Sequence, residues 1–194
     1  MNEHKVVFTG SLGAGKTTAI ASISEIPVIN TDIQTSDFTK PVMRQIGAHS
    51  STPSIEVANR SMTTVAMDYG EVNLELGKKL RLYGTPGQQR FDYMWKVLIH
   101  GAQGLVIFVD NAGTDPIGDL ARYTDIFREY ILTTHTVVAV TRMDLVPRPS
   151  IQVYHNYLHQ LGIQLPVFSV DARSSESVAN MVGHLVEMIN GESC

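Results

Sequence analysis

The stretch 10-GSLGAGKT-17 decides the fold class of this sequence. It matches the pattern G-x-x-x-x-G-K-[ST]. It lies between a short apolar run at 5–9, KVVFT, and a helical pattern that begins at about residue 16. In this strand, loop and helix context the pattern forms a phosphate-binding loop. The sequence therefore predicts a P-loop near its start and an α/β fold around it.

The residues of this loop have distinct expected roles. Their backbone N–H groups are expected to surround phosphates, helped by the positive end of the helix dipole. Lys16 is expected to reach the β- and γ-phosphates and to act in catalysis, and Thr17 to place its hydroxyl on Mg²⁺. The predicted phosphate-binding residues are Gly10, Ser11, Gly13, Ala14, Gly15, Lys16, Thr17 and Thr18.

Apolar runs of strand length alternate with helical patterns along the rest of the chain. The runs at 105–110 and 137–141 are almost continuously apolar, which is typical of strands covered by helices on both faces. This alternation predicts a mostly parallel central sheet with flanking helices. The other predicted strands are 65–76, 79–83 and 166–171, and the predicted helices cover about 16–26, 88–101, 116–132, 150–161 and 175–190.

One pair of strands is expected to run antiparallel, at the edge of the sheet. The runs 65–76 and 79–83 are joined by Gly77 and Lys78, a short turn of the kind found in hairpins. Gly70, inside the first arm, predicts a β-bulge. The segment 27–63 has no clear period, and a loop of that length is usually functional, mobile, or contains short elements that the pattern does not reveal. We therefore interpret about 27–64 as an extended switch region.

Composition limits the class of protein. The 194 residues fit a single domain, 1–194. The net charge of -4, with scattered Lys and Arg, argues against a nucleic-acid binder. The one cysteine, Cys194, excludes an internal disulfide, and it is not placed as in a C-a-a-X lipidation box. No apolar run reaches the length of a signal peptide or a spanning helix. We expect a cytoplasmic protein without a stable membrane anchor.

A second motif, 83-YGTPGQQRF-91, follows the second strand of the hairpin. Gly87 is expected to donate its N–H to the γ-phosphate, and Gln88 to orient the attacking water. An aspartate at position 84 would hold Mg²⁺ through a water, but Gly84 has no side chain, and we expect no other acidic residue nearby until Asp92. Mg²⁺ keeps several waters and needs few protein ligands, so we expect weaker metal binding.

The segment 60-RSMTTVAMDY-69 offers two further candidates. A threonine just before a strand can bind both Mg²⁺ and the γ-phosphate, and Thr64 is preferred to Thr63 because it directly abuts the strand. Arg60 is either an arginine finger acting within its own chain, worth about 10³–10⁵ in rate, or a solvated loop residue. The predicted metal ligands are therefore Thr17 and Thr64.

The stretch 141-TRMD-144 follows a buried strand and predicts a base pocket. The Asp144 carboxylate can accept two hydrogen bonds from guanine, which adenine cannot return; the alternative is an ordinary turn aspartate. Thr141 is expected to be a polar tether, and the stem of Arg142 to cover the base. In 171-DAR-173 the N–H of Ala172 can meet guanine O6, and Arg173 is assigned to the same pocket.

In this order the motifs resemble those of the Ras-like small GTPases across nearly the whole chain. Four stretches are more closely similar to the bacterial small GTPases of the conservon operons and the gliding-motility polarity (MglA-like) GTPases. The resemblance implies a Ras-like G domain, a GDP/GTP cycle with Mg²⁺, and a roadblock-domain partner as activator or scaffold. The four stretches are IPVINTD (26–32), TTVAMDYG (63–70), LYGTPGQQRF (82–91) and VDARSSESV (170–178).

Three functions remain open on the sequence. The first is a slow GTPase that acts as a molecular switch in a bacterial regulatory system. The second is a P-loop ATPase or kinase, favoured if Asp144 does not read guanine. The third is a GTP-binding interaction module with negligible turnover, which Gly84 favours. Away from these motifs, His155 and His159 have the i, i+4 spacing of a metal pair, but no third ligand is apparent. Asp110 is interpreted as a turn residue.

Overall fold

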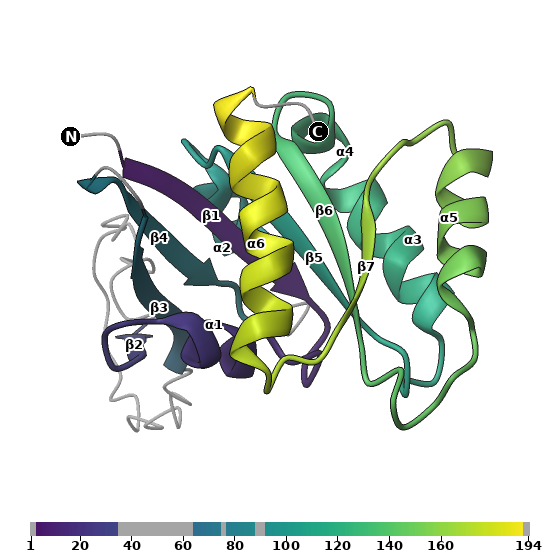
Figure 1. Cartoon of the computed structure of the whole chain (residues 1–194), viewed down its shortest axis with the longest axis horizontal. Helices are drawn as coiled ribbons and strands as arrows, with labels where there is room; N and C mark the ends of the chain where they lie inside the picture. Colours follow the sequence, from purple (N-terminus) through teal and green to yellow (C-terminus); the bar gives the residue numbers. More distant parts are fainter. Residues whose placement is uncertain (1–2, 35–63, 75–76, 88–91, 192–194) are drawn as a thin grey trace, which may run out of the picture.

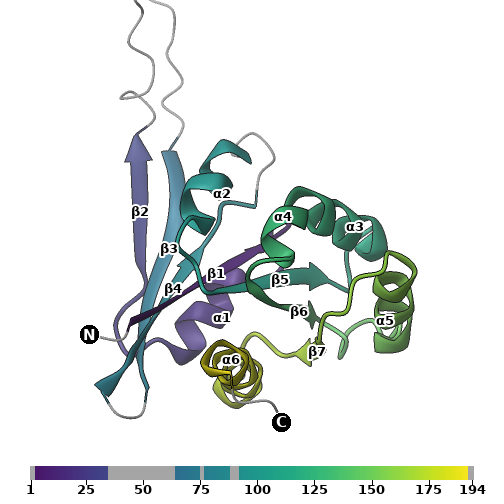
Figure 2. The same cartoon turned by 90° about the horizontal axis from the view of Figure 1, so that it is seen from above.

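The structure, a computed structural model, describes residues 3–34, 64–74, 77–87 and 92–191. Within these residues seven strands form one sheet, in the order β2-β3-β4-β1-β5-β6-β7. Helices cover both faces of the sheet, as Figures 1 and 2 show. The α/β fold predicted for a P-loop NTPase, with a mostly parallel sheet and flanking helices, is confirmed.

Except for β2, which was not predicted, the elements lie where the sequence predicted them, with shifts at their ends. The strands are β1 (Glu3–Gly10), β2 (Ile29–Gln34), β3 (Thr64–Asn73), β4 (Lys79–Gly84), β5 (Gly104–Asp110), β6 (His135–Thr141) and β7 (Val167–Val170). The helices are α1 (Lys16–Ile23), α2 (Asp92–Ile99), α3 (Pro116–Ile126), α4 (Arg128–Ile131), α5 (Ile151–Gln160) and α6 (Ser175–Asn190). The helix predicted at 116–132 is thus divided in two at Phe127.

Five neighbouring strands, β4, β1, β5, β6 and β7, run parallel. Their carboxyl ends therefore meet at one edge of the sheet, where open α/β sheets bind their ligands. The loop 10–17 follows β1 at this edge, the motif 83–91 follows β4, and the stretches 141–144 and 171–173 follow β6 and β7. The topology brings all four predicted motifs to the same end of the molecule.

The predicted antiparallel pair is present, but it does not form the edge of the sheet. β3 pairs antiparallel with β4 on one side and with β2 on the other, so β2 takes the outermost place. β2 lies inside the segment that the sequence left without a period. Its sequence, INTDIQ, has only two apolar residues, and Ile29 is half exposed. An edge strand does not need a continuous apolar face, and this one therefore gives no clear sequence signal.

The expected bulge at Gly70 is not found. The pairing of β3 with β4 continues in regular register through this residue, with Tyr69 opposite Tyr83 and Gly70 opposite Leu82. A Cβ at position 70 would instead lie 2.7 Å from Cγ2 of Ile20 in α1. The glycine therefore lets α1 approach β3 closely, and this contact positions the start of α1 beside the same strand.

The helices lie on both faces of the sheet (Figure 2), and the core has one layer of buried side chains under each set of helices. Alternate residues of β1 point to opposite faces, as the pleat requires. The layer under α1 and α6 includes Val6, Phe8, Ile20, Val178 and Met181, and the layer under α2, α3 and α5 includes Val7, Trp95, Leu120, Tyr154 and Leu158. In the part of the chain that the structure describes, no helix is both long and apolar enough to cross a bilayer.

Trp95 links this second layer to the loop after β4. Its ring is fully buried, and it packs against Tyr123 and Phe127 at centroid distances of 5.5 and 5.9 Å. Its Nε1 donates a hydrogen bond of 3.0 Å to the carbonyl oxygen of Pro86. The start of the motif 83–91 is therefore fastened to the core just before Gly87.

Candidate functional site

The loop between β1 and α1 has a backbone that requires glycine at two points. Gly10 has a φ of 141°, and a Cβ there would lie 2.2 Å from the carbonyl oxygen of Phe108 in β5. Gly15, the N-cap of α1, has a φ of 97°, and its Cβ would lie 3.1 Å from the Cβ of Ala172. Both glycines permit contacts that a side chain would block, so the loop packs closely on its neighbours.

Lys16, the first residue of α1, places its ammonium group against this loop. Its side chain is buried, and Nζ donates hydrogen bonds to the carbonyl oxygens of Gly10 (2.7 Å) and Ser11 (2.8 Å). Burial lowers the pKa of Lys16 to about 8, while the nearby carboxylate of Asp68 acts in the opposite direction. A buried ammonium held inside a glycine-rich loop is suited to contact an anionic phosphate.

Two further contacts hold the loop from outside. The hydroxyl of Ser11 donates a hydrogen bond of 2.7 Å to Asp119 of α3. On the other side, a Cβ at position 87 would lie 2.5 Å from the backbone nitrogen of Leu12, so the loop after β4 rests directly on the loop after β1. Gly87 therefore lies against the phosphate-binding loop. The hydrogen bond expected from its N–H to the γ-phosphate stays a prediction.

Thr17 contacts an acidic residue that the sequence analysis did not single out. Its hydroxyl donates a hydrogen bond to the carboxylate of Asp68, in the middle of β3. Asp68 lies directly opposite Gly84 in the antiparallel pair of β3 and β4. The expectation that nothing acidic lies near Gly84 before Asp92 is therefore wrong, because the adjacent strand brings a carboxylate to this point.

The predicted base residues gather in one pocket that adjoins the start of α1. All five of them line it, together with two residues of the phosphate-binding loop and helix. The pocket is lined by Gly15, Thr18, Thr141, Arg142, Asp144, Leu145, Asp171, Ala172 and Arg173. Leu145 and Asp171 were not predicted, although each is the chain neighbour of a residue that was.

The stretch 141–144 is tied to the phosphate-binding loop by side chains. The buried hydroxyl of Thr141 lies 3.1 Å from the carbonyl oxygen of Ala14 and 3.3 Å from that of Val109. One guanidinium nitrogen of Arg142 donates to the carbonyl of Gly13 at 2.9 Å, and another pairs with Asp110. Thr141 thus ties this stretch to the phosphate-binding loop, and the roles expected of Thr141 and Arg142 toward a base stay predictions. Asp110 pairs with Arg142 and also accepts a hydrogen bond within its own turn.

Asp144 lies on the wall of the pocket with half of its side chain exposed. Its Oδ2 accepts a hydrogen bond of 3.0 Å from Arg173, and Arg173 also pairs with Asp171 at 2.8 Å. The hydrogen bond from Arg173 lowers the pKa of Asp171, so that carboxylate remains ionised. Asp144 is therefore held at the pocket by a salt bridge and is accessible to the donor groups of a base.

The sequence that forms this site also matches a known family. The profile of a family described as "Conserved hypothetical ATP binding protein" matches residues 8–190. The chain belongs to this family. The match runs from within β1 to the last residue of α6, and it therefore includes all four motifs that meet at the carboxyl edge of the sheet. Binding of a nucleotide through a P-loop is the property that this membership supports.

The chain is also similar to a curated protein whose name states no function. The chain is 28% identical over 109 residues to the "Uncharacterized protein MJ1339" of Methanocaldococcus jannaschii. The aligned part is 56% of this chain and 52% of that protein, so the chain spans about half of its length. Neither match names a small GTPase, and neither supports the resemblance to the MglA-like GTPases.

The structure does not describe the side chains of three predicted site residues. Arg60 and Gln88 lie outside the described residues. Thr64 begins β3, four residues and roughly 13 Å of extended strand before Asp68, and its side chain also lies outside the description. Their roles as arginine finger, water-positioning residue and metal ligand stay predictions.

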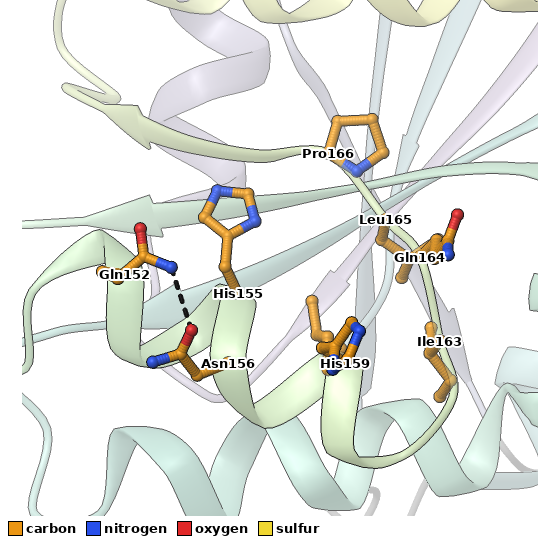
Figure 3. Close-up of a pocket in the computed structure, with 9 residues that line it drawn as sticks. Gln152, His155, Asn156, His159, Ile163, Gln164, Leu165 and Pro166 are labelled. Atoms are coloured by element: carbon orange, nitrogen blue, oxygen red, sulfur yellow. Dashed lines mark hydrogen bonds between the residues drawn. The ribbon is translucent and has the colours of Figure 1, made fainter.

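A second hollow lies between α5 and the chain leading into β7, away from the predicted motifs (Figure 3). His155 and His159 both line it, one turn apart on α5. In the described part of the chain, no group of three or more His, Cys, Asp or Glu side chains could hold a metal ion. The two histidines therefore gain no third ligand there, and the hollow bears none of the phosphate-binding features.

Proposed function

We propose that the chain binds a nucleoside triphosphate and hydrolyses its γ-phosphate. The observation that carries the proposal is the contact between two sites predicted separately. The pocket of Asp144 begins at Gly15 and Thr18, the residues on either side of Lys16 and Thr17. One ligand can therefore place its phosphates in the loop 10–17 and its base against Asp144. Family membership supports the same general function.

The residues of the chain divide the chemistry among them. The N–H groups of the loop and the ammonium of Lys16 bind and orient the phosphates. Gln88 is proposed to orient a water whose oxygen attacks the γ-phosphorus, and Arg60 to offset the developing charge. The bond from the γ-phosphorus to the bridging oxygen breaks, which gives a nucleoside diphosphate and inorganic phosphate. Bound Mg²⁺ would neutralise phosphate charge, and the hydroxyl oxygen of Thr17 fits it as a ligand.

Two bases are candidates, and each has a separate support. The description of the family names ATP, which favours the P-loop ATPase. The position of Asp144 at the base pocket favours guanine, because a carboxylate can accept from both N1 and the 2-amino group. If the protein is a GTPase, we propose that it acts as a molecular switch with a roadblock-domain protein as its activator. That partner and the switch role rest on the resemblance to the MglA-like GTPases alone.

The experiment that tests the proposal is phosphate release from purified protein incubated with Mg²⁺ and either GTP or ATP. Chromatography of the products should show the matching diphosphate in equal amount to the phosphate. Release from GTP alone supports the switch GTPase, and release from ATP alone supports the ATPase. Tight binding of either nucleotide without release would contradict hydrolysis and favour a nucleotide-dependent interaction module.

A further inference from the structure

We propose that Asp68 supplies, from the neighbouring strand, the carboxylate for Mg²⁺ that Gly84 cannot supply. This inference rests on the proposed nucleotide binding and deepens it. Gly84 occupies the position of the motif 83–91 at which an aspartate would hold the metal through a water. The structure shows that the acidic group has not been lost from this part of the fold, since it stands on β3 in place of β4.

The strand pairing explains how the two positions can be exchanged. Asp68 and Gly84 are directly opposite partners in an antiparallel pair, and such partners project toward the same face of a sheet. A Cβ added at position 84 would lie 3.0 Å from both the Cβ and Oδ2 of Asp68. The carboxylate therefore already occupies the space into which a side chain at position 84 would extend. Glycine at 84 is what leaves room for it.

The same Cβ would lie 3.1 Å from Cδ1 of Ile20, which places this space against α1. Thr17, one turn earlier on that helix, donates its hydroxyl hydrogen to the Asp68 carboxylate. The predicted metal ligand and the relocated acid are thus in direct contact. They form a pair of oxygen donors beside Lys16, at the start of α1.

This donor pair fits Mg²⁺ by its chemistry. The ion prefers oxygen ligands, keeps several waters, and commonly takes only one or two carboxylates from a protein, the rest coming from phosphates. A carboxylate that faces the ion directly or through a water also contributes charge that a hydroxyl lacks. Thr17 and Asp68 therefore suffice as the protein's share of such a site, and a cluster of three acidic side chains is not required.

The competing explanation is purely structural, namely that Asp68 only fastens α1 to β3 through Thr17. The variant Asp68→Asn separates the two roles. An asparagine has the same shape and its carbonyl oxygen still accepts the hydrogen bond from Thr17, but its charge is lost. A structural role would survive this change, whereas a role toward a divalent cation would not.

The experiment measures Mn²⁺ affinity by electron paramagnetic resonance, with protein saturated by GTPγS and, separately, by ATPγS. With the analogue that binds, Asp68→Asn is expected to weaken Mn²⁺ binding by about 10- to 100-fold. Asp125→Asn, on the exposed face of α3, is the matched control and is expected to leave the affinity unchanged. Equal Mn²⁺ affinity of Asp68→Asn and the parent chain would overturn the inference.

A second variant guards against an indirect effect of the substitution. In the double variant Asp68→Gly with Gly84→Asp, the two residues exchange places across the strand pair, and the side chain that would crowd position 84 is gone. Mn²⁺ affinity is expected to return to within a few-fold of the parent chain, from the low value of Asp68→Gly alone. Failure of the exchange to restore any affinity, in a variant with parental thermal unfolding, would contradict the relocation.

Failure of the inference can be told apart from failure of the proposed function. If the parent chain binds neither GTPγS nor ATPγS, the nucleotide site itself is wrong. If the parent binds an analogue and its Mn²⁺ affinity is insensitive to Asp68, only the metal role of Asp68 is wrong.

Discussion

The guanidinium of Arg142 donates a hydrogen bond of 2.9 Å to the carbonyl oxygen of Gly13. This bond joins the loop after β6, which carries Asp144, to the phosphate-binding loop after β1. A second bond, from Thr141 to Ala14, runs in parallel with it. The base pocket and the phosphate site are therefore parts of one connected structure, and changes in either are expected to affect both.

Asp144→Asn tests whether the base pocket reads guanine. The carboxylate accepts from two N–H groups of guanine, while an asparagine offers a donor in place of one acceptor. We expect GTP affinity to fall about tenfold or more, a change of about 1.4 kcal/mol, and xanthosine triphosphate affinity to rise relative to GTP. Titrations with both nucleotides, and with the exposed control Asp125→Asn, measure this. An unchanged ratio of the two affinities would remove Asp144 from base reading.

Thr141→Val tests the tie between the two loops. The valine has nearly the shape of threonine, but it leaves the buried carbonyls of Ala14 and Val109 without this hydroxyl. Loss of a partner from a buried polar group costs about 1–3 kcal/mol, so urea unfolding should show a free energy of unfolding lower by that amount. Thr133→Val, at an exposed position after α4, should change it far less. Equal effects of the two substitutions would show that the buried bond is not stabilising.

Gln88→Leu tests the positioning of water. The leucine keeps the size of the side chain but can neither donate to nor accept from a water. We expect nucleotide affinity to stay within a few-fold while phosphate release falls on the order of tenfold to a hundredfold. Gln160→Leu, exposed at the end of α5, is the control. If Gln88→Leu releases phosphate at the rate of the parent chain, both alone and with any activating partner, another residue must position the water.

The pH dependence of nucleotide binding follows from Lys16. Burial lowers its pKa from 10.5 to about 8, so between these two pH values the unfolded chain binds more protons at Lys16 than the folded chain does. The contribution of Lys16 to folding stability therefore rises with pH through this window. Nucleotide affinity should change in the opposite direction, because deprotonation removes the cation that faces the phosphates.

At about pH 8.5, binding should therefore draw a proton onto Lys16. Calorimetric titrations in two buffers of different ionisation enthalpy would detect this proton uptake. The side chain of Lys16→Arg stays charged at every pH used, so any nucleotide binding by this variant should occur without proton uptake. Binding by the parent chain with no proton uptake would mean that Lys16 is already fully charged in the folded protein.

The parallel core of the fold could be predicted because its strands carry a strong local signal. The runs at 105–110 and 137–141 are apolar almost throughout, and both prove to be buried on both faces. β2 could not be predicted in the same way. It lies at the edge, with Asn30, Thr31 and Asp32 in its middle, and only its pairing with β3 makes it a strand.

In the candidate site, too, some residues could be predicted from the sequence and others could not. The loop 10–17 and the stretch 141–144 are contiguous motifs, so their residues could be named before the structure. Asp68 could not, since its proximity to Thr17 depends on the register of two strands. A two-residue turn at Gly77 and Lys78 would have placed Glu71 opposite Gly84. The observed connection spans 74–78, and this longer loop brings Asp68 there.

The most direct test of the account is a titration of nucleotide-stripped protein with fluorescent GTP and ATP analogues in Mg²⁺ buffer, for the parent chain and for Lys16→Ala. Lys78→Ala, at the opposite end of the sheet, is the control. The account predicts saturable binding of at least one analogue by the parent and the control. Affinity should fall by roughly 10- to 100-fold in Lys16→Ala, since bonds to a charged group contribute about 1.5–3 kcal/mol. Binding of neither analogue, or equal affinity of Lys16→Ala and the parent, would contradict a nucleotide site at the loop 10–17.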